Sequence, residues 1–490
     1  MPAFLLEFFS EEIPARMQKR AEEDLVRLLG AELEAAGLGK LSLRTMSGPR
    51  RIAIMGELPA GAASVNEERK GPRVGAPEQA LAGFLKAAGL ARIEDAQIQK
   101  DPKGDFYVAR IAREGRATPA ILAEAIPKTA RAFPWPKSMR SGTSDFTWVR
   151  PLHEVLCLFD GAPVAFEVGG VKSGARTWGH RFHSAGAIEI TDPKQYEEKL
   201  RAAFVLADRE VRKAKILADA KAACAARALS LVEDAGLLEE VAGLAEWPVV
   251  VLGDMDPAFL DLPAEVIRLT MRTHQRYFAV RGADGRLAPH FVTVANVEAK
   301  DGGKAIAAGN ARVLSARLND ARFFWEQDRK LKLGDPARVE KLKSIVFHQK
   351  LGSVWDKVER VAALAQELAL VAGADPALVA RAARLAKCDL VTETVGEFPE
   401  LQGQIGRQLA ELEGEHPSVA AAIEDHYRPL GPNDRVPSDP VAITLALADK
   451  LDTLVGFWAI DEKPTGSRDP YALRRAALGI CRVLLENNVR

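Results

Sequence analysis

The chain has 490 residues, too many for one ordinary domain, and its length predicts about three domains. Hydrophobic residues make up 47% and charged residues 27% of the composition, as in soluble globular proteins. The 67 basic and 67 acidic residues cancel, so bulk charge neither indicates nor excludes nucleic acid, and any such binding must come from local patches.

The cysteines and the N-terminus exclude several classes of protein. The four cysteines form no C-x-x-C pair, which supports neither a zinc ribbon nor a disulfide framework, and a reducing cytoplasm fits them best. No basic region precedes the first apolar run, and no apolar run reaches about 18 residues. We therefore expect no signal peptide and no membrane partner. The cysteines are Cys157, Cys224, Cys388 and Cys481.

The first residues predict a strand, a helix and a strand pair. Residues 4–9 form an apolar run typical of a buried strand, and a helix opens at Pro14 and ends at Gly37. Residues 41–57 predict two strands broken at a Ser-Gly-Pro turn. This order indicates an α+β unit over residues 1–65.

Residues 66–153 predict a second α+β region. Residues 60–75 are a candidate linker, helices are expected near 78–90 and 118–132, and a strand is expected at 105–111. The end of the region, from 127 on, interleaves five cations with four aromatic residues and has one acid, which suits phosphate contact with base stacking. The alternative is that the aromatic residues are core and the cations its rim. These residues are Lys128, Arg131, Lys137, Arg140, Arg150, Phe133, Trp135, Phe146 and Trp148.

Strands with turns are expected over residues 154–190, followed by helices over 194–230. The helices carry a charged face that could cover RNA or could simply be solvated. An Ala-Asp-Gly turn between Tyr277–Val280 and Leu287–Phe291 predicts a hairpin. The stretch 169–182 has three cations, no acid and a histidine beside a glycine, which predicts a phosphate-binding loop. These four residues are Lys172, Arg176, His180 and Arg181.

From about residue 305 the pattern is helical to the end. Near the C-terminus, Asp469 can cap a helix with Pro470 in its first position. Arg474 and Arg475 lie off the apolar stripe of this helix, where the helix dipole opposes each by roughly 0.3–1 kcal/mol. That disadvantage suggests an acidic partner, either protein or phosphate; a solvated face is the alternative.

One constellation in the helical region has ligand types for a metal. Its histidines and aspartates, separated by helices, resemble the metal-binding pattern of the HD phosphohydrolase superfamily, in which a His-Asp pair supplies central ligands. Here the pair is Cys388-Asp389, so one imidazole is replaced by a softer thiol. We expect a retained fold without a metal, with a metal-dependent phosphohydrolase as the alternative. The residues are His348, Asp389, His416, His426 and Asp449.

Motifs over essentially all 490 residues point to one family. The longest are Asp389–Gly403, Ala448–Gly456 and Lys463–Gly479. With these motifs the chain resembles the β subunit of bacterial, heterotetrameric glycyl-tRNA synthetase. Further similar motifs are Glu7–Pro14 (EFFSEEIP), Arg140–Pro151, Gly179–Phe182 (GHRF), Glu246–Pro248 (EWP), Gly309–Phe324 and Phe347–Arg360.

The resemblance implies a tRNA-binding subunit of an aminoacyl-tRNA synthetase. In this family the α subunit carries the class II catalytic core and uses ATP and Mg, while the β subunit binds tRNA(Gly). The resemblance thus implies an α2β2 heterotetramer, with no cofactor and no catalytic residue in this chain. A pure scaffold subunit is the alternative. Candidate contacts to tRNA are Arg140, Arg150, Arg176, His180, Arg181, Arg474 and Arg475.

The resemblance also implies an α+β multidomain fold. A module similar to B3/B4 of another synthetase is expected within residues 154–330, and a degenerate, all-helical HD-type domain within 335–490. Relatives continue past Arg490 into a helical anticodon-binding domain, so we expect anticodon recognition to be missing from this chain.

Overall fold

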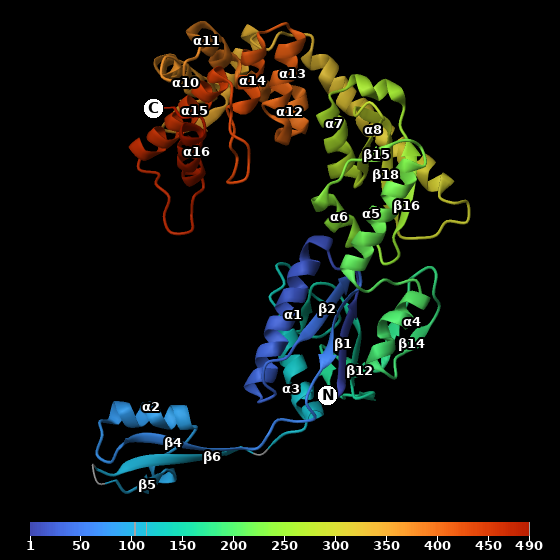
Figure 1. Cartoon of the computed structure of the whole chain (residues 1–490), viewed down its shortest axis with the longest axis vertical. Helices are drawn as coiled ribbons and strands as arrows, with labels where there is room; N and C mark the ends of the chain where they lie inside the picture. Colours follow the sequence, from blue (N-terminus) through green and yellow to red (C-terminus); the bar gives the residue numbers. More distant parts are fainter. Residues whose placement is uncertain (102–103, 114, 490) are drawn as a thin grey trace. The chain divides into compact units, whose positions relative to one another are not determined.

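The computed structural model describes residues 1–101, 104–113 and 115–489 (Figure 1). Arg490, the last residue of the expected helical domain, lies outside these ranges. Helices and several small sheets alternate along the chain, which confirms the α+β class. The chain divides into two compact units. Unit 1 consists of Met1–Arg227, Glu233–Val251 and Thr293–Lys304, and unit 2 of Ala228–Val232, Leu252–Val292 and Ala305–Arg490.

The main sheet of unit 1 carries helices on both faces. Its elements are β1 (Ala3–Ser10), α1 (Ala15–Ala35), β2 (Leu43–Gly48), β3 (Arg51–Glu57), α3 (Thr118–Arg131), β9 (Leu152–Phe159), β10 (Ala162–Pro163), β11 (Glu167–Val168), β12 (Val171–Gly174) and α4 (Tyr196–Ala202). The strand order is β11-β12-β9-β1-β3-β2, with β10 beside β9. The central strand β1 is antiparallel to β3 and β9, so the predicted strand, helix and strand pair are confirmed.

Side chains alternate along β1, and this alternation decides what each face of the sheet meets. Phe4, Leu6 and Phe8 pack in the core beneath α1 and α3. Leu5 and Glu7 point to the opposite face, on which α4 lies (Figure 1). The sequence therefore buries a carboxylate in the core on the α4 side.

The candidate linker at residues 60–75 is instead a strand of a small sheet. β4 (Val65–Arg73), β6 (Phe106–Arg113) and β5 (Gln97–Gln99) form this sheet in the order β4-β6-β5, together with α2 (Glu78–Ala88). The linker prediction is wrong because β4 is polar and finds its backbone partner, β6, about forty residues later. The buried cluster here is small, and it includes Phe84, Ala88 and Ala109.

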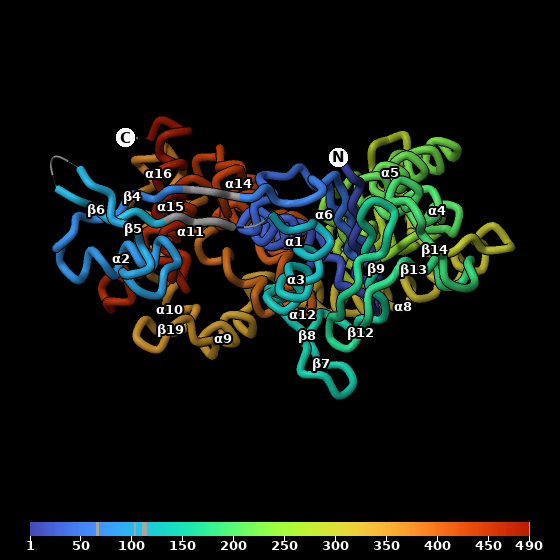
Figure 2. The backbone as a smooth tube through the Cα atoms, turned by 90° about the horizontal axis from the view of Figure 1, so that it is seen from below, coloured from blue at the N-terminus to red at the C-terminus, as the bar shows by residue number. Residues whose placement is uncertain are grey.

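The rest of unit 1 is made of short hairpins and helices. Figure 2 shows the hairpin of β7 (Met139–Arg140) and β8 (Thr147–Trp148) as a projection of the backbone. The helical pattern predicted for residues 194–230 is interrupted by Ala203–Asp208, between α4 and α5 (Arg209–Ala225). The remaining elements are β7 (Met139–Arg140), β8 (Thr147–Trp148), β13 (Arg176–Trp178), β14 (Ala187–Glu189), α5 (Arg209–Ala225) and α6 (Ala235–Ala242).

A four-stranded sheet and a helical bundle make up the rest of the fold. The sheet order is β15-β17-β18-β16, and the predicted hairpin forms between β17 and β18. Among the described residues, no helix is both long and apolar enough to cross a membrane. The elements are β15 (Ser230–Leu231), β16 (Val249–Asp254), α7 (Ala264–Leu269), β17 (Phe278–Arg281), β18 (Leu287–Ala295), α8 (Lys304–Asp328), α9 (Pro336–Ser344), β19 (Val346–His348), β20 (Gly352–Ser353), α10 (Val354–Ala369), α11 (Pro376–Leu385), α12 (Glu393–Glu397), α13 (Gln404–Leu412), α14 (Pro417–Asp425), α15 (Pro440–Ala459) and α16 (Leu473–Glu486).

Two details of the helical region differ from the prediction. The β19–β20 hairpin interrupts the helices, because two short segments pair around a turn. The last helix begins at Leu473 rather than at Pro470, since Ala472 has a left-handed backbone with φ 55°. Asp469 still caps it, and its carboxylate accepts the N–H groups of Leu473 (2.8 Å) and Arg474 (3.0 Å).

Candidate nucleic-acid interface

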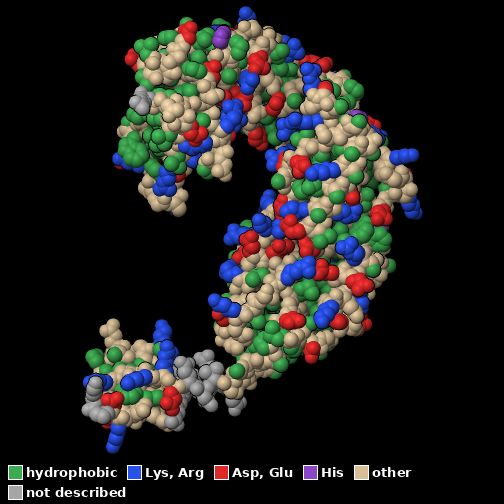
Figure 3. All heavy atoms as spheres, viewed as in Figure 1, with side chains coloured by type: hydrophobic (Ala, Val, Ile, Leu, Met, Phe, Trp, Pro, Cys, Tyr) green, Lys and Arg blue, Asp and Glu red, His purple; other side chains and the backbone are tan. Residues whose placement is uncertain are grey.

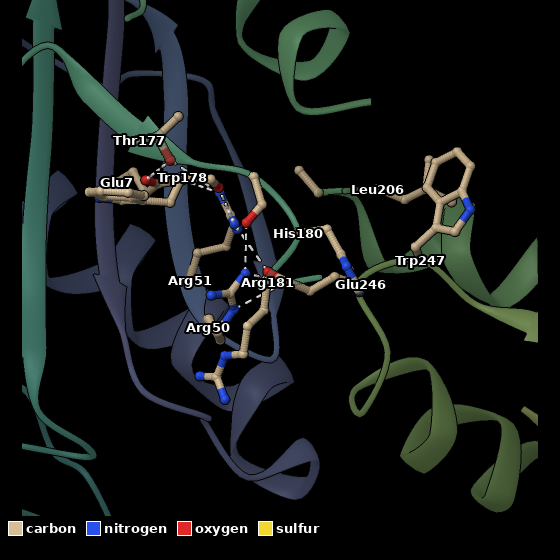
Figure 4. Close-up of polar contacts among 12 residues, drawn as sticks. Glu7, Arg50, Arg51, Thr177, Trp178, His180, Arg181, Leu206, Glu246 and Trp247 are labelled. Carbon is tan, nitrogen blue, oxygen red and sulfur yellow. Dashed lines mark hydrogen bonds and ion pairs between the residues drawn. The ribbon is translucent and has the colours of Figure 1, made fainter. Parts of the chain in front are cut away.

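A buried network of charged groups lies at the centre of unit 1 (Figure 4). Glu7 is fully buried, and its carboxylate accepts hydrogen bonds from the hydroxyls of Thr177 and Tyr196. Arg51 is 1% exposed and bridges Glu7 (3.1 Å) and Glu246 (3.0 Å). The guanidinium therefore neutralises two carboxylates that would otherwise be buried without a cation.

Arg50 completes this network from the other side of Glu246. Its guanidinium lies 2.6 Å from the Glu246 carboxylate and donates 2.8 Å to the carbonyl of Gly179. Arg51 donates in the same way to the carbonyl of Trp178, also at 2.8 Å. Three motifs far apart in the sequence, EFFSEEIP, GHRF and EWP, thus meet through two adjacent arginines that follow the Ser-Gly-Pro turn.

The network fixes the conformation of the loop Trp178–His183. Besides the two carbonyls held by arginines, the Nδ1 of buried His180 accepts the N–H groups of Phe182 (3.2 Å) and His183 (3.3 Å). Burial lowers the pKa of His180, which favours the neutral ring that this acceptor role requires. A Cβ at Gly179 would lie 2.5 Å from Oγ of Ser184 and 2.7 Å from Cβ of Ala203, so this position has room only for glycine.

The same loop presents two aromatic rings and a cation to solvent. Phe182 is 73% exposed and Trp178 38%, and the Arg181 side chain is 46% exposed. His180, in contrast, is fully buried, so it holds the loop and does not itself face a ligand. A rigid loop with exposed aromatic and cationic side chains can stack bases and contact phosphates.

The cations of the predicted phosphate-binding loop form ion pairs with acidic residues from other parts of the chain. Arg176 lies 3.3 Å from Glu154, and Arg181 lies 3.0 Å from both Glu11 and Glu12. Exposed ion pairs of this kind are worth only about 0–1 kcal/mol, so a phosphate could replace these partners. Basic and acidic side chains are also mixed over the visible face of the molecule (Figure 3).

The basic and aromatic segment at residues 127–153 separates into a core and a rim. Phe133, Phe146 and Trp148 are at most 9% exposed and pack with Phe8, with ring centroids 5.1–5.9 Å apart in the pairs that include Trp148. The alternative interpretation, that these aromatic residues belong to the core, is therefore confirmed for the three rings. The prediction that they stack on bases is wrong, because they are buried against one face of β1. Arg140, on β7, is exposed.

Arg150 and the C-terminal arginines are placed differently from one another. Arg150 is half-buried and donates to the carbonyl of Val149 at 2.8 Å. Arg474 is exposed and donates to the carbonyl of Gly466 at 2.6 Å, which fixes the turn before α16. Arg475, beside it, is also exposed. The proximity of these arginines to a phosphate or a second subunit stays a prediction.

In unit 2, two of the five HD-like residues meet around a lysine. The Nζ of Lys387 lies 2.7 Å from Nε2 of His426 and 3.2 Å from Oδ1 of Asp449. The Nζ of Lys357 lies 3.4 Å from the same Oδ1. Burial disfavours the charge of Asp449, but Lys387 and Lys357 outweigh it and hold the pKa of this carboxyl far below its usual range.

The other three HD-like residues have other partners. Oδ2 of buried Asp389 accepts the N–H groups of Gly403 (2.5 Å) and Gly406 (3.1 Å), and burial raises the pKa of Asp389 to about 6. His416 is exposed and accepts the N–H of Ser418, whereas the ring of His348 packs edge-on to Phe457 and Tyr471.

These residues do not fit a metal ion. Within the described ranges, no group of three or more His, Cys, Asp or Glu residues could hold one. The cation beside Asp449 and His426 is the ammonium of Lys387, a residue that the sequence pattern did not single out. In the sequence, only its position directly before Cys388-Asp389 could have pointed to Lys387.

The buried network predicts acid sensitivity of unit 1. Burial opposes ionisation of Glu246, yet Arg51 and Arg50 outweigh it and lower the pKa of this carboxyl. Because the folded-state pKa of Glu246 lies below its unfolded value, ionised Glu246 stabilises the fold at pH values above the unfolded pKa. This stability is lost as the pH falls through the folded-state pKa, so the free energy of unfolding of unit 1 should decrease below about pH 4. Urea unfolding of wild type and Glu246→Gln across this range checks it: the variant should be less stable at neutral pH and should lose less on acidification.

The whole chain is similar to known proteins. A family model described as "Glycyl-tRNA synthetase beta subunit" matches residues 4–490. A curated "Glycine--tRNA ligase beta subunit" from Phenylobacterium zucineum is 58% identical over 496 aligned residues, which cover 100% of this chain and 73% of the relative. One of the same description from Rhodospirillum centenum is 52% identical over 520 residues, which cover 100% of this chain and 72% of the relative.

Proposed function

The chain belongs to the glycyl-tRNA synthetase beta subunit family and is a subunit of an aminoacyl-tRNA synthetase, and we propose that its own task is to bind tRNA(Gly). It would hold the tRNA so that the 3′ end reaches the active site of an α subunit, which would use ATP and Mg. Positioning of this kind can supply large effective molarity without chemistry by the positioning chain.

The observation that best supports this proposal is the fixed loop Trp178–His183. Burying the ions of the Glu7–Arg51–Glu246 network is expensive, and their hydrogen bonds are used to hold the carbonyls at the start of this loop. The loop in turn exposes Phe182 and Arg181, whose chemistry suits an unpaired base and a phosphate. The acids beside Arg181 would then exclude non-specific anions until a phosphate displaces them.

Further contacts belong to the same proposal. The exposed β7–β8 hairpin carries Arg140 and is anchored by buried Trp148, which supports a role in backbone contact. Arg150 and Arg176 would add phosphate contacts in unit 1. Arg474 and Arg475 would contact either tRNA phosphates or the α subunit.

The finer architecture is also part of the proposal. We infer a B3/B4-like module within residues 154–330 and a degenerate HD-type domain within 335–490, preceded by α+β regions at 1–65 and 66–153. The assembly would be an α2β2 heterotetramer, as the word "beta" in the names of the relatives suggests. The free thiols of all four cysteines support a site of action in the cytoplasm.

Titration of tRNA(Gly) against the protein tests the loop. Phe182→Ala should weaken binding by about 5- to 150-fold, because one stacked base contributes roughly 1–3 kcal/mol. Arg181→Gln should reduce the slope of log affinity against log salt by about one, the share of one phosphate contact. Filter binding at several salt concentrations measures both.

Arg20→Gln is the matched control, because this arginine is exposed on α1 and its partner Asp24 is also paired with Arg27. It should leave affinity and salt slope unchanged. A flat salt dependence of the wild type, or equal affinity of all variants, would show that this surface does not bind tRNA. Binding to an α subunit without any tRNA affinity would support the scaffold alternative instead.

A further inference from the structure

Three lysines and one aspartate lie together in the core of the helical part of unit 2. Lys357, Lys387 and Lys450 are 5–7% exposed, and the side chain of Asp449 is 13% exposed. They come from α10, from the segment after α11, and from α15. Buried ammonium groups are rare because removal from water is costly, so each needs a specific partner.

The partners of Lys387 are the groups that metal ions use. Its Nζ lies 3.2 Å from the Asp449 carboxylate, 2.7 Å from Nε2 of His426 and 3.9 Å from the centre of the Tyr427 ring. A carboxylate oxygen and an imidazole nitrogen are ligands typical of divalent cations. The ring face of Tyr427 adds a further attraction for a cation.

The hydrogen bonds of His426 define which nitrogen faces the lysine. Its Nδ1 lies 2.8 Å from the carbonyl of Ile423, and a carbonyl can only accept, so Nδ1 carries the hydrogen. Nε2 therefore presents its lone pair to Lys387. This is the tautomer and the outer-shell hydrogen bond of an imidazole that ligates a metal through Nε2.

The charge and the space at this site also match a filled cation position. Lys357 and Lys387 approach the same oxygen of Asp449, at 3.4 and 3.2 Å, and Lys357 also lies 3.2 Å from Asp452, so two ammonium groups face two carboxylates here. The remaining cavity, lined by Lys357, Lys387, His426 and Asp449, measures about 10 Å³, which leaves room for no more than one water.

We propose that the ammonium of Lys387, assisted by Lys357, is a built-in replacement for a divalent cation in this domain. It joins the segments that carry His426 and Asp449 as a bound metal would. The domain would therefore hold its fold without metal and would not respond to metal or chelator. This inference is independent of the proposed tRNA binding.

Metal analysis of the wild-type chain tests the proposal without any variant. After incubation with Mn²⁺ or Zn²⁺ and desalting, the protein should retain no stoichiometric metal, and EDTA should leave its thermal midpoint unchanged. One equivalent of retained metal, or a midpoint lowered by EDTA, would overturn the proposal. This measurement decides even where a variant fails to fold.

Variants of Lys387 give a second readout. Lys387→Met should lower the midpoint of unit 2 by about 10 °C, because it leaves Asp449 with one cation fewer. Lys387→Met combined with Asp449→Asn should lose less than the sum of the single changes. Lys343→Met, which removes only a surface pair with Glu340, is the control and should change the midpoint little. Strict additivity of the two buried changes would count against the proposal.

Chemical rescue tests whether the charge or the volume of the Lys387 side chain matters. In Lys387→Ala, propylammonium chloride should raise the thermal midpoint, since it can supply an ammonium to the vacated space. Propanol, or sodium chloride at the same ionic strength, should not. Equal rescue by propanol would show that the Lys387 side chain acts by filling space, and the proposal would fail.

Discussion

Replacing Arg51 by methionine should lower the free energy of unfolding of unit 1 by about 3–5 kcal/mol, the loss expected when one partner of a buried ion pair is removed. The methionine would leave Glu7 and Glu246, which are 0% and 2% exposed, without the guanidinium that lies between them. It would also release the carbonyl of Trp178. Urea unfolding followed by tryptophan fluorescence measures the change.

The same variant should also weaken tRNA binding, because the loop Trp178–His183 would lose one of its supports. Arg20→Met is the control for stability, since Arg20 is exposed and its partner Asp24 keeps a second cation, Arg27, at 2.5 Å. Its loss should therefore cost at most about 1 kcal/mol. A loss for Arg51→Met no larger than for this control would mean that the buried network contributes little. If Arg51→Met kept full tRNA affinity, the buried network would not be needed for tRNA binding.

Replacing Trp148 by alanine should cost about 3–5 kcal/mol of stability, the range for truncating a large buried aromatic side chain. Trp148 is 2% exposed and packs against Phe8, Phe133 and Phe146. It also pairs with Met139 at the base of the β7–β8 hairpin. The change should therefore loosen the hairpin that carries Arg140 in addition to destabilising the core.

Trp178→Ala is the matched control, because that tryptophan is 38% exposed and its loss leaves no comparable cavity. Thermal unfolding should show a large decrease of the midpoint for Trp148→Ala and a small one for Trp178→Ala. Proteolysis of the native protein should show new cleavage near Arg140 in the first variant only. Equal thermal midpoints for the two variants would contradict the interpretation that the aromatic cluster around Trp148 anchors the β7–β8 hairpin.

Much of the fold was predictable from local pattern. The buried strand at 4–9, the helix after Pro14 and the strand pair at 41–57 follow from periodicity and turn residues. The strand at 65–73 was not predictable, because a polar strand is defined by its backbone partner β6, and no local signal reports that pairing. The start of α16 was missed because proline after aspartate is equally compatible with a turn.

The candidate site was predictable only in part. The sequence pointed to cations, and the structure shows that acids from other segments lie beside Arg176 and Arg181. Burial of His180 could not be seen from its neighbours either. The buried arginines at 50 and 51 were hidden because they follow a turn signal and read as surface residues. The motifs EFFSEEIP, GHRF and EWP were the better guide, since all three meet at this network.

The division of the chain into units has a consequence for synthesis on the ribosome. The chain changes from one unit to the other after residues 227, 232, 251, 292 and 304. Asn296, whose side chain accepts the N–H groups of Glu246 and Trp247, belongs to the last segment of unit 1. Most of unit 1 is translated early, but the backbone N–H of Glu246 gains its hydrogen bond to Asn296 only after residue 296 has emerged from the ribosome. A nascent chain of 250 residues would hold Glu246 without this support.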